Sequence, residues 1–251
     1  MIDLHCHLLH GIDDGAENIE QGIALARAAV DDGITHAVAT PHIHAGRYQN
    51  SAASIANVHK EFCQVLERES IPLHLGFAAE VRLCAELPLL LIQDQVPFLG
   101  EWDGSKVLLL ELPHSHIPPG IENFLKWLAD RNIRAMIAHP ERNKDIMRDF
   151  RKIEPLVRNE CLFQVTATSL TGHFGEAAKL CSEKMVRRGF ITVLATDSHH
   201  ITRRPPNLNA GRRAAEQLVG ESNSWELVWG NPQIIASCHF ISDASSGEYL
   251  T

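Results

Sequence analysis

Short apolar segments alternate with longer amphipathic segments along most of the chain. Seven of the apolar segments are rich in β-branched residues and are predicted to be strands: residues 1–7, 34–40, 73–79, 106–112, 134–140, 162–167 and 191–196. Between them, apolar residues recur at helical spacing, as they do from Ile19 through Ile23 and Ala26 to Val30. This alternation predicts repeated strand–helix units and therefore a parallel sheet covered by helices.

Two more helices are predicted by the same spacing, one around Ile55, Val58 and Phe62 and one from Ile121 to Leu128. Residues that commonly end helices follow three of the helical segments: Gly33, Asn132 and Gly189. The chain shows no internal repeat, low-complexity tract or linker. We therefore expect one domain spanning residues 1–251.

Composition narrows the function classes. Hydrophobic residues make up 45% of the chain and charged residues 22%, which are ordinary globular values. The net charge of −8 argues against a nucleic-acid-binding surface and against an anionic membrane partner. The start of the chain does not resemble a signal peptide, and the longest apolar run, LPLLLI, is too short to span a bilayer.

The cysteines indicate the compartment. All six lie far apart and none forms a C-x-x-C pair: Cys6, Cys63, Cys84, Cys161, Cys181 and Cys238. Such spacing is typical of free thiols rather than of a disulfide framework. We therefore expect a cytoplasmic protein.

Imidazoles and carboxylates follow the carboxyl ends of nearly all the predicted strands. They are His5, His7, His42, Glu80, Glu111, His139, Asp197 and His199, with Asp14 in the loop after the first strand. Parallel α/β folds build their sites at this edge. An open sheet would spread the strand ends along a line, whereas a barrel brings the first and last strands together. The distribution therefore favours a closed or nearly closed barrel of seven strands.

The spacing within the first strand orients its side chains. His5 and His7 are two residues apart, so both are expected on one face, with Leu4 and Cys6 pointing outward toward the helices. Asp3 shares the face of the histidines in this scheme. We hypothesise that its carboxylate orients an imidazole.

The candidate ligands are too many for one ion. Two or three ions that share at least one carboxylate are therefore expected. All the donors are nitrogen or oxygen, which suits manganese, iron or zinc and disfavours a structural zinc site. Other roles stay open for single residues, namely helix caps for Asp14 and Asp197 and an ion pair for Glu111. Together at one edge, however, the nine residues favour a metal site.

The remaining histidines are interpreted differently. Most are taken as surface residues or satisfied polar residues: His36, His59, His74, His114, His116, His173 and His239. Three lie beside the candidate ligands and stay undecided: His10, His44 and His200.

Arginines favour a phosphate among the possible substrates. Divalent ions at a barrel mouth make hydroxide from water and could hydrolyse amides or phosphate esters. Arg47, Arg142, Arg203 and Arg204 all follow candidate ligands within a few residues. Guanidinium groups match phosphate oxygens in geometry and charge. For any single arginine, an exposed loop position is an equally good interpretation.

A cysteine-phosphatase signature is present by chance. Cys181 and Arg187 fit C-x5-R, but the segment between them has no glycine to form a phosphate-binding loop. Ala178, Cys181 and Met185 follow helical spacing instead. We therefore expect Cys181 to pack against the barrel and reject a phosphocysteine mechanism.

Several motifs together resemble a known family. "HCH", "DDG", "ATPH", Glu80, Glu111, "IAHPERN", "TATSLTGHFG" and "TDSHH" occur in this order along essentially the whole chain. They resemble the polymerase and histidinol phosphatase (PHP) superfamily. Within it, the chain is similar to the bacterial manganese-dependent protein tyrosine phosphatases that accompany capsule and exopolysaccharide tyrosine kinases. The resemblance implies a distorted (β/α)7 TIM-like barrel with three divalent ions, most often manganese, with iron or zinc as alternatives.

The resemblance also implies roles for single residues. One ion would be held by His5, His7 and Asp197 with Glu80 bridging, a second by Glu80, Glu111 and His139, and a third by Asp14, His42 and His199. Arg142 and Arg204 match phosphate-binding arginines of the family, and Arg47 lies in a loop that carries a basic residue there. His200 is a departure, because relatives often have asparagine at this position.

The function implied is the hydrolysis of phosphotyrosine by a metal-activated hydroxide, without a phosphoenzyme. The partner would be the tyrosine-rich tail of a membrane-anchored bacterial tyrosine kinase, with no nucleic acid and no membrane insertion. Three alternatives stay open. They are a small-molecule phosphomonoesterase such as histidinol phosphate phosphatase, a metal-dependent amidohydrolase, and a non-catalytic metal-binding scaffold.

Overall fold

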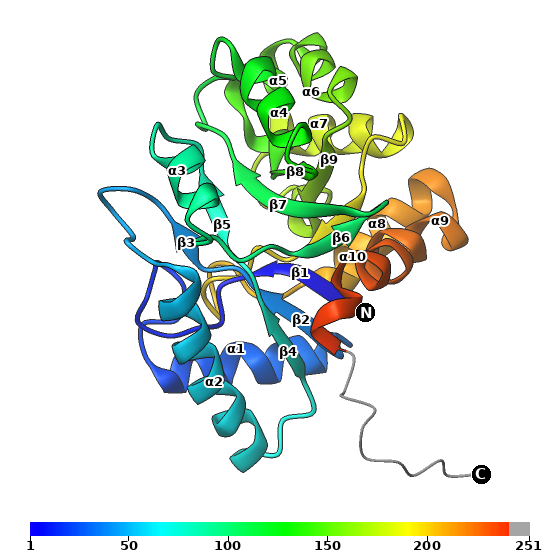
Figure 1. Cartoon of the computed structure of the whole chain (residues 1–251). Coiled ribbons are helices and arrows are strands. Elements are labelled where there is room, and N and C mark those ends of the chain that lie inside the picture. Colours follow the sequence, from blue (N-terminus) through cyan, green and yellow to red (C-terminus); the bar gives the residue numbers. More distant parts are fainter. Residues whose placement is uncertain (241–251) are drawn as a thin grey trace, which may run out of the picture.

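A ring of parallel strands forms the centre of the computed structural model, which describes residues 1–240 (Figure 1). The strands of the ring are β1 (Ile2–Cys6), β2 (His36–Ala39), β3 (His42–Ile43), β4 (His74–Phe77), β5 (Glu80–Arg82), β7 (Ser105–Glu111), β8 (Ile133–Ala138), β9 (Leu162–Thr166) and β10 (Val193–Ala195). All seven predicted strands are confirmed within a few residues at their ends.

Two of the strands continue after a break beyond their predicted ends. β2 and β3 are separated at Thr40 and Pro41, where proline lacks an N–H and restricts the residue before it. β4 and β5 are separated at Ala78 and Ala79. Parallel pairing resumes beyond both breaks, because β2 pairs with β4 and β3 pairs with β5. Each interrupted pair therefore acts as one strand of the ring.

Backbone hydrogen bonds run all the way around this ring. One sheet has the order β1–β2–β4 and the other has the order β10–β9–β8–β7–β5–β3. The two sheets also meet at β1 and β10, where Asp197 N donates to His5 O (2.7 Å) and His7 N donates to Ser198 O (2.9 Å). The predicted distorted seven-stranded barrel is therefore confirmed. One further strand, β6 (Gly100–Trp102), pairs antiparallel with β7 and was not predicted.

Helices cover the outside of the barrel (Figure 1). The predicted ones are α1 (Ile19–Asp31), α2 (Ala52–Arg68), α4 (Ile121–Ala129) and α7 (Glu176–Arg187). The others are α3 (Leu87–Ile92), α5 (Lys144–Arg148), α6 (Glu154–Arg158), α8 (Leu208–Val219), α9 (Glu221–Trp225) and α10 (Asn231–Phe240), with short 3₁₀ turns η1 (Pro140–Arg142), η2 (Phe150–Ile153) and η3 (Ala167–Ser169) and a π turn η4 (Glu226–Gly230). The predicted helix ends at Gly33, Asn132 and Gly189 all have positive φ, as such positions require.

The end of the barrel interior opposite the strand carboxyl ends is apolar and closed. Ile2 and Leu4 pack there with inward-facing residues of the other strands and with Ile235 and Ala236 of α10. Figure 1 shows α10 beside the N-terminus and the start of β1. A Cβ on Gly100 would collide with the carbonyl oxygen of Ile235, so this glycine allows β6 and α10 to approach closely. We call this closed region the lower interior.

The expected orientation of Leu4 was wrong. β1 shifts register against β2 between Asp3 and Cys6, where three steps of β1 oppose two of β2. A bulge of this kind adds one residue and breaks the strict alternation of faces. Leu4 therefore joins the lower interior, whereas Cys6 packs outside with the helices as expected.

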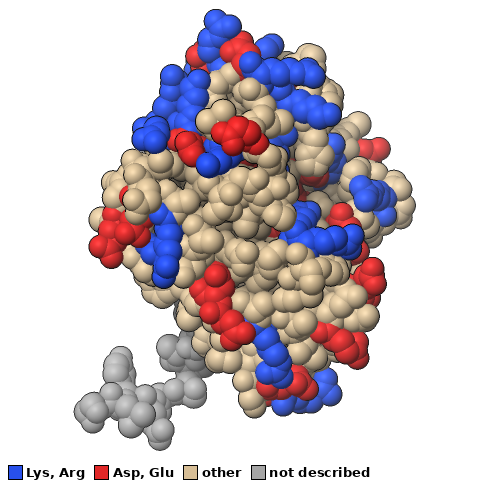
Figure 2. Space-filling model, turned by 180° about the vertical axis from the view of Figure 1, so that it is seen from behind, with Lys and Arg blue, Asp and Glu red and all other residues tan. Residues whose placement is uncertain are grey.

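Surface charge is distributed unevenly. Figure 2 shows Lys and Arg side chains gathered at the end of the molecule that carries α5–α7, with acidic side chains among them. The exposed basic residues of these segments include Arg148, Arg151, Lys152, Arg187 and Arg188. The negative net charge therefore leaves local regions of the opposite sign. Among residues 1–240, no helix has the length and apolar character needed to cross a membrane.

Candidate metal centre

His5 and His7 occupy the centre of the barrel mouth, the ring formed by the carboxyl ends of the strands. Both are fully buried, and their Nε2 atoms lie 3.3 Å apart, which confirms that they share one face. The His5 Nδ1–H donates to Gln164 Oε1 (2.9 Å), and the His7 Nδ1–H donates to Asp13 Oδ2 (2.7 Å). These bonds fix both rings with Nε2 directed into the site, which is the arrangement found for histidines that bind metals.

Gln164 and Asp13 were not identified from the sequence. Gln164 was the one amide within an otherwise apolar strand, which is a usable signal. Asp13 was part of the "DDG" motif, but only Asp14 was selected. Asp3, by contrast, makes no hydrogen bond with an imidazole of the described residues. Its carboxylate accepts from the N–H of His5 and from the N–H and hydroxyl of Thr196. The hypothesis that Asp3 orients a histidine ring was therefore wrong.

Glu80, from β5, links several imidazoles. Its Oε2 lies 3.1 Å from His5 Nε2 and 3.2 Å from His42 Nδ1, and its Oε1 lies 2.7 Å from His139 Nε2. The side chain is 1% exposed. A buried carboxylate with different partners on its two oxygens has the geometry of a bridging ligand.

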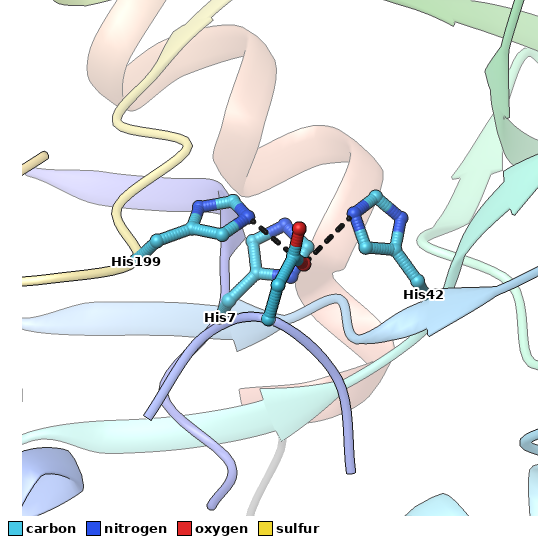
Figure 3. A group of neighbouring side chains, drawn as sticks. His7, His42 and His199 are labelled. Atoms are coloured by element: carbon cyan, nitrogen blue, oxygen red, sulfur yellow. Dashed lines mark ion pairs between the residues drawn. The ribbon is translucent and has the colours of Figure 1, made fainter. Parts of the chain in front are cut away.

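Asp14, His42 and His199 form the outer part of the site. His42 Nε2 and His199 Nε2 lie 3.3 Å and 3.5 Å from Asp14 Oδ1. Figure 3 shows the rings of His7, His42 and His199 directed toward one another. Asp14 does not cap a helix, since Asn18 caps α1. The glycine of "DDG", Gly15, packs so closely on His7 that a Cβ would collide with the backbone and Cβ of that residue.

Glu111 lies in an ion pair and also beside other candidate metal ligands, the two environments considered for it from the sequence. Its Oε1 pairs with Arg82 Nη1 (2.8 Å) and with His114 Nε2 (3.3 Å), so an ion pair exists. It also lies in one group with His42 and Glu80. His114, interpreted from the sequence as a surface or satisfied residue, lines the cavity and stacks on His139. Arg82 was missed, although it is two residues after Glu80 and therefore on the same face of the strand.

Three arginines reach the same opening. Arg142 Nη2 and Arg204 Nη2 each lie 2.5 Å from Asp197 Oδ2. Arg47 is exposed and lies 4.0 Å from Asp14 Oδ2. All three line a cavity of about 190 Å³ together with most of the candidate ligands. Arg203 lines a neighbouring cavity of about 470 Å³ instead.

The pKa values follow from burial and pairing. Burial disfavours a charge on His5 and His7, but nearby carboxylates outweigh it and raise the pKa of each to about 9. Burial and the Arg142 charge lower the pKa of His139 to about 3, and burial and His7 lower the pKa of His199 to about 4. Burial opposes ionisation of Asp197, yet Arg142, His5 and Arg204 hold the pKa of its carboxyl well below the usual range. Neighbouring cations likewise lower the pKa of the Glu80 and Asp14 carboxyls, whereas burial and the charge of Glu80 raise the pKa of Glu111.

Three groups of these residues have the composition and spacing of metal sites. They are His7, Asp14, His42 and His199; His5, His7, Glu80 and Asp197; and His42, Glu80 and Glu111, with the donor atoms of each group within 4.8 Å of one another. Imidazole nitrogens and carboxylate oxygens without thiolates suit divalent transition ions. His42 Nδ1 is buried and lies 3.2 Å from Glu80 Oε2 without forming a hydrogen bond, as expected of a nitrogen that can bind a metal ion. The donors therefore fit the metal chemistry expected from the sequence.

The undecided histidines have separate positions. His44 lines the cavity of the candidate site, and His200 accepts a hydrogen bond on Nδ1 from the N–H of Thr202 and lines the neighbouring cavity. His10 lies beside Phe62, outside the cavity wall. Apart from His114, the histidines interpreted as surface or satisfied residues are also absent from the residues that line this cavity.

Cys181 has no catalytic environment. It is buried on α7 and packs in the hydrophobic core, as expected. Burial raises the pKa of its thiol to about 12, so it is not a thiolate at neutral pH. The rejection of a phosphocysteine mechanism is consistent with this position.

The barrel and its ligand groups are typical of TIM-barrel-like, metal-dependent hydrolases. Residues 1–237 match the family described as capsular polysaccharide synthesis, CpsB/CapC. The chain therefore belongs to the CpsB/CapC family.

Named relatives agree with this assignment. The tyrosine-protein phosphatase YwqE of Bacillus subtilis is 35% identical over 204 residues, which cover 81% of this chain and 79% of the relative. The tyrosine-protein phosphatase CpsB of Streptococcus pneumoniae is 24% identical over 94% of this chain and 98% of the relative.

Solved structures show the same fold. One crystal structure, from work on YwqE and CpsB as metal-dependent tyrosine phosphatases, has a TM-score of 0.87 and 32% identity, with 94% of each chain covered. An organophosphorus hydrolase from Deinococcus radiodurans has a TM-score of 0.54 at 14% identity, with 92% of this chain and 90% of that chain covered, and shares the fold alone.

Proposed function

We propose that this chain is a single-domain, metal-dependent protein-tyrosine phosphatase. The observation that carries the proposal is the convergence of three arginines and seven candidate metal ligands on one cavity, with His5 and His7 buried in the same ligand groups. Membership of a family whose named relatives are tyrosine-protein phosphatases supports it. The reaction would be the hydrolysis of a phosphotyrosyl ester to tyrosine and phosphate.

The metal ligands we propose follow the groups described above. His5, His7, Asp197 and Glu80 would hold one ion, and Asp14, His42 and His199 would hold another. Glu80, Glu111 and His139 would hold a third. In the structure, Glu111 forms a group with His42 and Glu80, and His139 Nε2 lies 2.7 Å from Glu80 Oε1. Manganese is the ion we favour, with iron or zinc as alternatives. Bound divalent ions would supply an activated water and neutralise phosphoryl charge.

The arginines would bind the phosphoryl group. Arg142 follows β8, Arg204 follows β10 and both contact Asp197, whereas Arg47 lies 4.0 Å from Asp14. Their charge-assisted hydrogen bonds would orient the phosphorus and stabilise the negative charge on its oxygens in the transition state. No cysteine is placed to form a phosphoenzyme, so water would attack phosphorus directly.

A protein substrate is favoured by the neighbouring cavity. This larger cavity shares Asp14, His199 and Arg204 with the cavity of the candidate site. A phosphotyrosine side chain in the smaller cavity would leave room beside it for the adjoining residues of a polypeptide. We propose that the substrate is the phosphorylated tail of a membrane-anchored bacterial tyrosine kinase. The six free thiols are compatible with the cytoplasm as the place of action.

The test is phosphate release from a phosphotyrosyl peptide and from histidinol phosphate, measured side by side. Each reaction is run with manganese and after treatment with a chelator. Turnover of the peptide that the chelator abolishes and manganese restores is expected. Turnover of histidinol phosphate alone would assign the site to small phosphomonoesters, and activity that survives thorough chelation would contradict the metal-dependent mechanism.

A further inference from the structure

Phe174 contacts both arginines that are paired with Asp197. The guanidinium carbon of Arg142 lies 4.6 Å from the centroid of the Phe174 ring, and that of Arg204 lies 5.9 Å from it. Both distances are within the range of cation–π attraction. We infer that Phe174 is a positioning residue that holds Arg142 and Arg204 side by side for a phosphoryl group. This inference rests on the proposed function of these two arginines.

The topology gives Phe174 this place. β9 lies between β8 and β10 in the sheet. Arg142 follows β8, Arg204 follows β10, and Phe174 lies in the loop that connects β9 with α7. One aromatic ring on the middle loop therefore reaches the arginines of both neighbouring loops.

The loop around Phe174 is an ordered turn with its own backbone hydrogen bonds. The N–H groups of Gly172 and His173 donate to the carbonyls of Ser169 and Thr168, and Gly175 N donates to Gly172 O. Gly172 and Gly175 have φ of 87° and 89°, values that L side chains rarely adopt. The His173 ring also packs edge-on against Phe174, with the ring centroids 5.0 Å apart. The half-buried phenyl ring is therefore placed by this hydrogen-bonded turn and contacts the exposed ring of His173.

An aromatic contact suits these arginines because both also pair with Asp197. Both guanidinium groups use Nη2 on the same oxygen of Asp197, and two like charges at one oxygen repel each other. Asp197 is also a proposed metal ligand, so its carboxylate cannot be the sole anchor of two cations. The face of Phe174 attracts both cations without using an N–H group.

The two arginines still have N–H donors that are free to bind a phosphoryl group. Nε of Arg142 and Nε of Arg204 are buried without a hydrogen-bond partner. A buried N–H without a partner is costly, so such groups are usually satisfied in the complete site. Phosphate oxygens that accept from these arginines would provide the missing bonds while Phe174 keeps the guanidinium planes in place.

The experiment compares Phe174→Leu, Phe174→Tyr and Phe174→Trp. Leucine keeps an apolar side chain without a π face, whereas tyrosine and tryptophan keep the face. Binding of inorganic phosphate to the manganese-loaded protein is measured by calorimetry, and kcat and KM are measured with an aryl phosphate. We expect Phe174→Leu to weaken phosphate binding by about 5- to 30-fold and to raise KM more than it lowers kcat. Both aromatic variants should stay within about threefold of the wild type.

Phe150 offers a matched control. Lys184 Nζ lies 4.4 Å and the guanidinium carbon of Arg188 lies 5.4 Å from the centroid of its ring. Phe150 does not line the cavity of the candidate site. Phe150→Leu should therefore leave phosphate binding unchanged. Manganese content is measured for each variant, and it should equal that of the wild type.

Three results would overturn the inference. One is wild-type phosphate binding by Phe174→Leu. The others are an equal loss of phosphate binding in all three variants and a loss of bound manganese, either of which would make the residue merely structural. Because calorimetry requires no turnover, phosphate binding can be measured even if phosphotyrosine is not hydrolysed. If phosphotyrosine is not hydrolysed but Phe174→Leu still weakens phosphate binding, only the proposed function fails.

Discussion

The two ends of the barrel interior use the same strands for opposite purposes. β1 contributes Ile2 and Leu4 to the lower interior and, directly above them, His5 and His7 to the mouth. The lower interior is apolar and closed by α10, whereas the mouth is lined by buried imidazoles, carboxylates and guanidinium groups. Of these two ends, the lower one therefore contributes apolar packing to the fold and the upper one carries the chemistry.

The interactions that stabilise the side chains differ between the two ends. Below, each side chain removes apolar surface from water, and a truncation loses that burial and leaves a cavity. Above, each buried charge is acceptable only because an opposite charge or hydrogen bond compensates for it. We therefore expect substitutions at the mouth to remove metal binding and activity, with some loss of stability where a buried charge loses its partner. Substitutions below should lower stability and leave metal binding and activity unchanged in the folded protein.

The largest expected effect is at the mouth. Asp197→Asn keeps the shape of the side chain but removes the charge that faces His5, Arg142 and Arg204. We expect kcat/KM with an aryl phosphate to fall by about 10⁴-fold or more, roughly 5.5 kcal/mol, because an ion and its activated water are lost. Bound manganese should fall with it. The melting temperature measured in chelator should also fall, because Arg142 and Arg204 lose their counter-charge, but the protein should still fold.

Asp130→Asn is the control, because Asp130 is exposed at the end of α4. It should leave activity and metal content unchanged. If Asp197→Asn unfolded the protein, the proposed separation of the two ends would be wrong.

The next largest effect is below. Ile235 is fully buried in the lower interior, and its neighbour on α10, Ile234, is 57% exposed. We expect Ile235→Ala to lower the free energy of unfolding by about 2–5 kcal/mol and Ile234→Ala by less than about 0.5 kcal/mol. Denaturant unfolding measures both. At a temperature where the variants are folded, kcat and manganese content should match the wild type, and a large loss of either in Ile235→Ala would show that the two ends are coupled.

The sequence predicted the features that depend on local periodicity and on strand ends. The seven strands and the clustering of the ligands at one opening follow from alternation along the chain and from parallel topology. The bulge at Leu4 could not be predicted, because it depends on the register of β1 against β2. α10 was missed as well, since "NPQIIASCHF" has no distinct apolar face by which to recognise a helix.

Within the site, the sequence did not predict the hydrogen-bond and ion-pair partners that come from other segments. Gln164 reaches both His5 and the N–H of His139 only because β9 is adjacent to β8 in the closed ring. His114 reaches Glu111 because of the path of the loop after β7. Neither relation is encoded by spacing along one segment.

Gln164 gives a smaller test at the boundary between the two ends. Its Oε1 holds His5 Nδ1 at 2.9 Å and accepts from His139 N at 3.1 Å. Gln164→Leu removes this acceptor, and we expect manganese affinity to fall by about 10- to 100-fold, because partners that orient metal-binding histidines have effects of this size. Gln164→Glu keeps an acceptor for both contacts and should lose less. Calorimetric titration with manganese measures each, and wild-type affinity in Gln164→Leu would show that the amide is only a packing group.

The smallest effect is expected outside both regions, at Cys181. Its burial on α7 and a thiol pKa raised to about 12 leave it without nucleophilic character at neutral pH. We expect Cys181→Ala to keep kcat/KM within about twofold of the wild type, since the residue contacts no group of the mouth, and to cost about 1 kcal/mol or less of stability, since little volume is removed. Chelation should abolish the activity of variant and wild type alike. If activity instead survived chelation and was lost in Cys181→Ala, the chemistry would belong to α7 and the mouth would be a structural metal site.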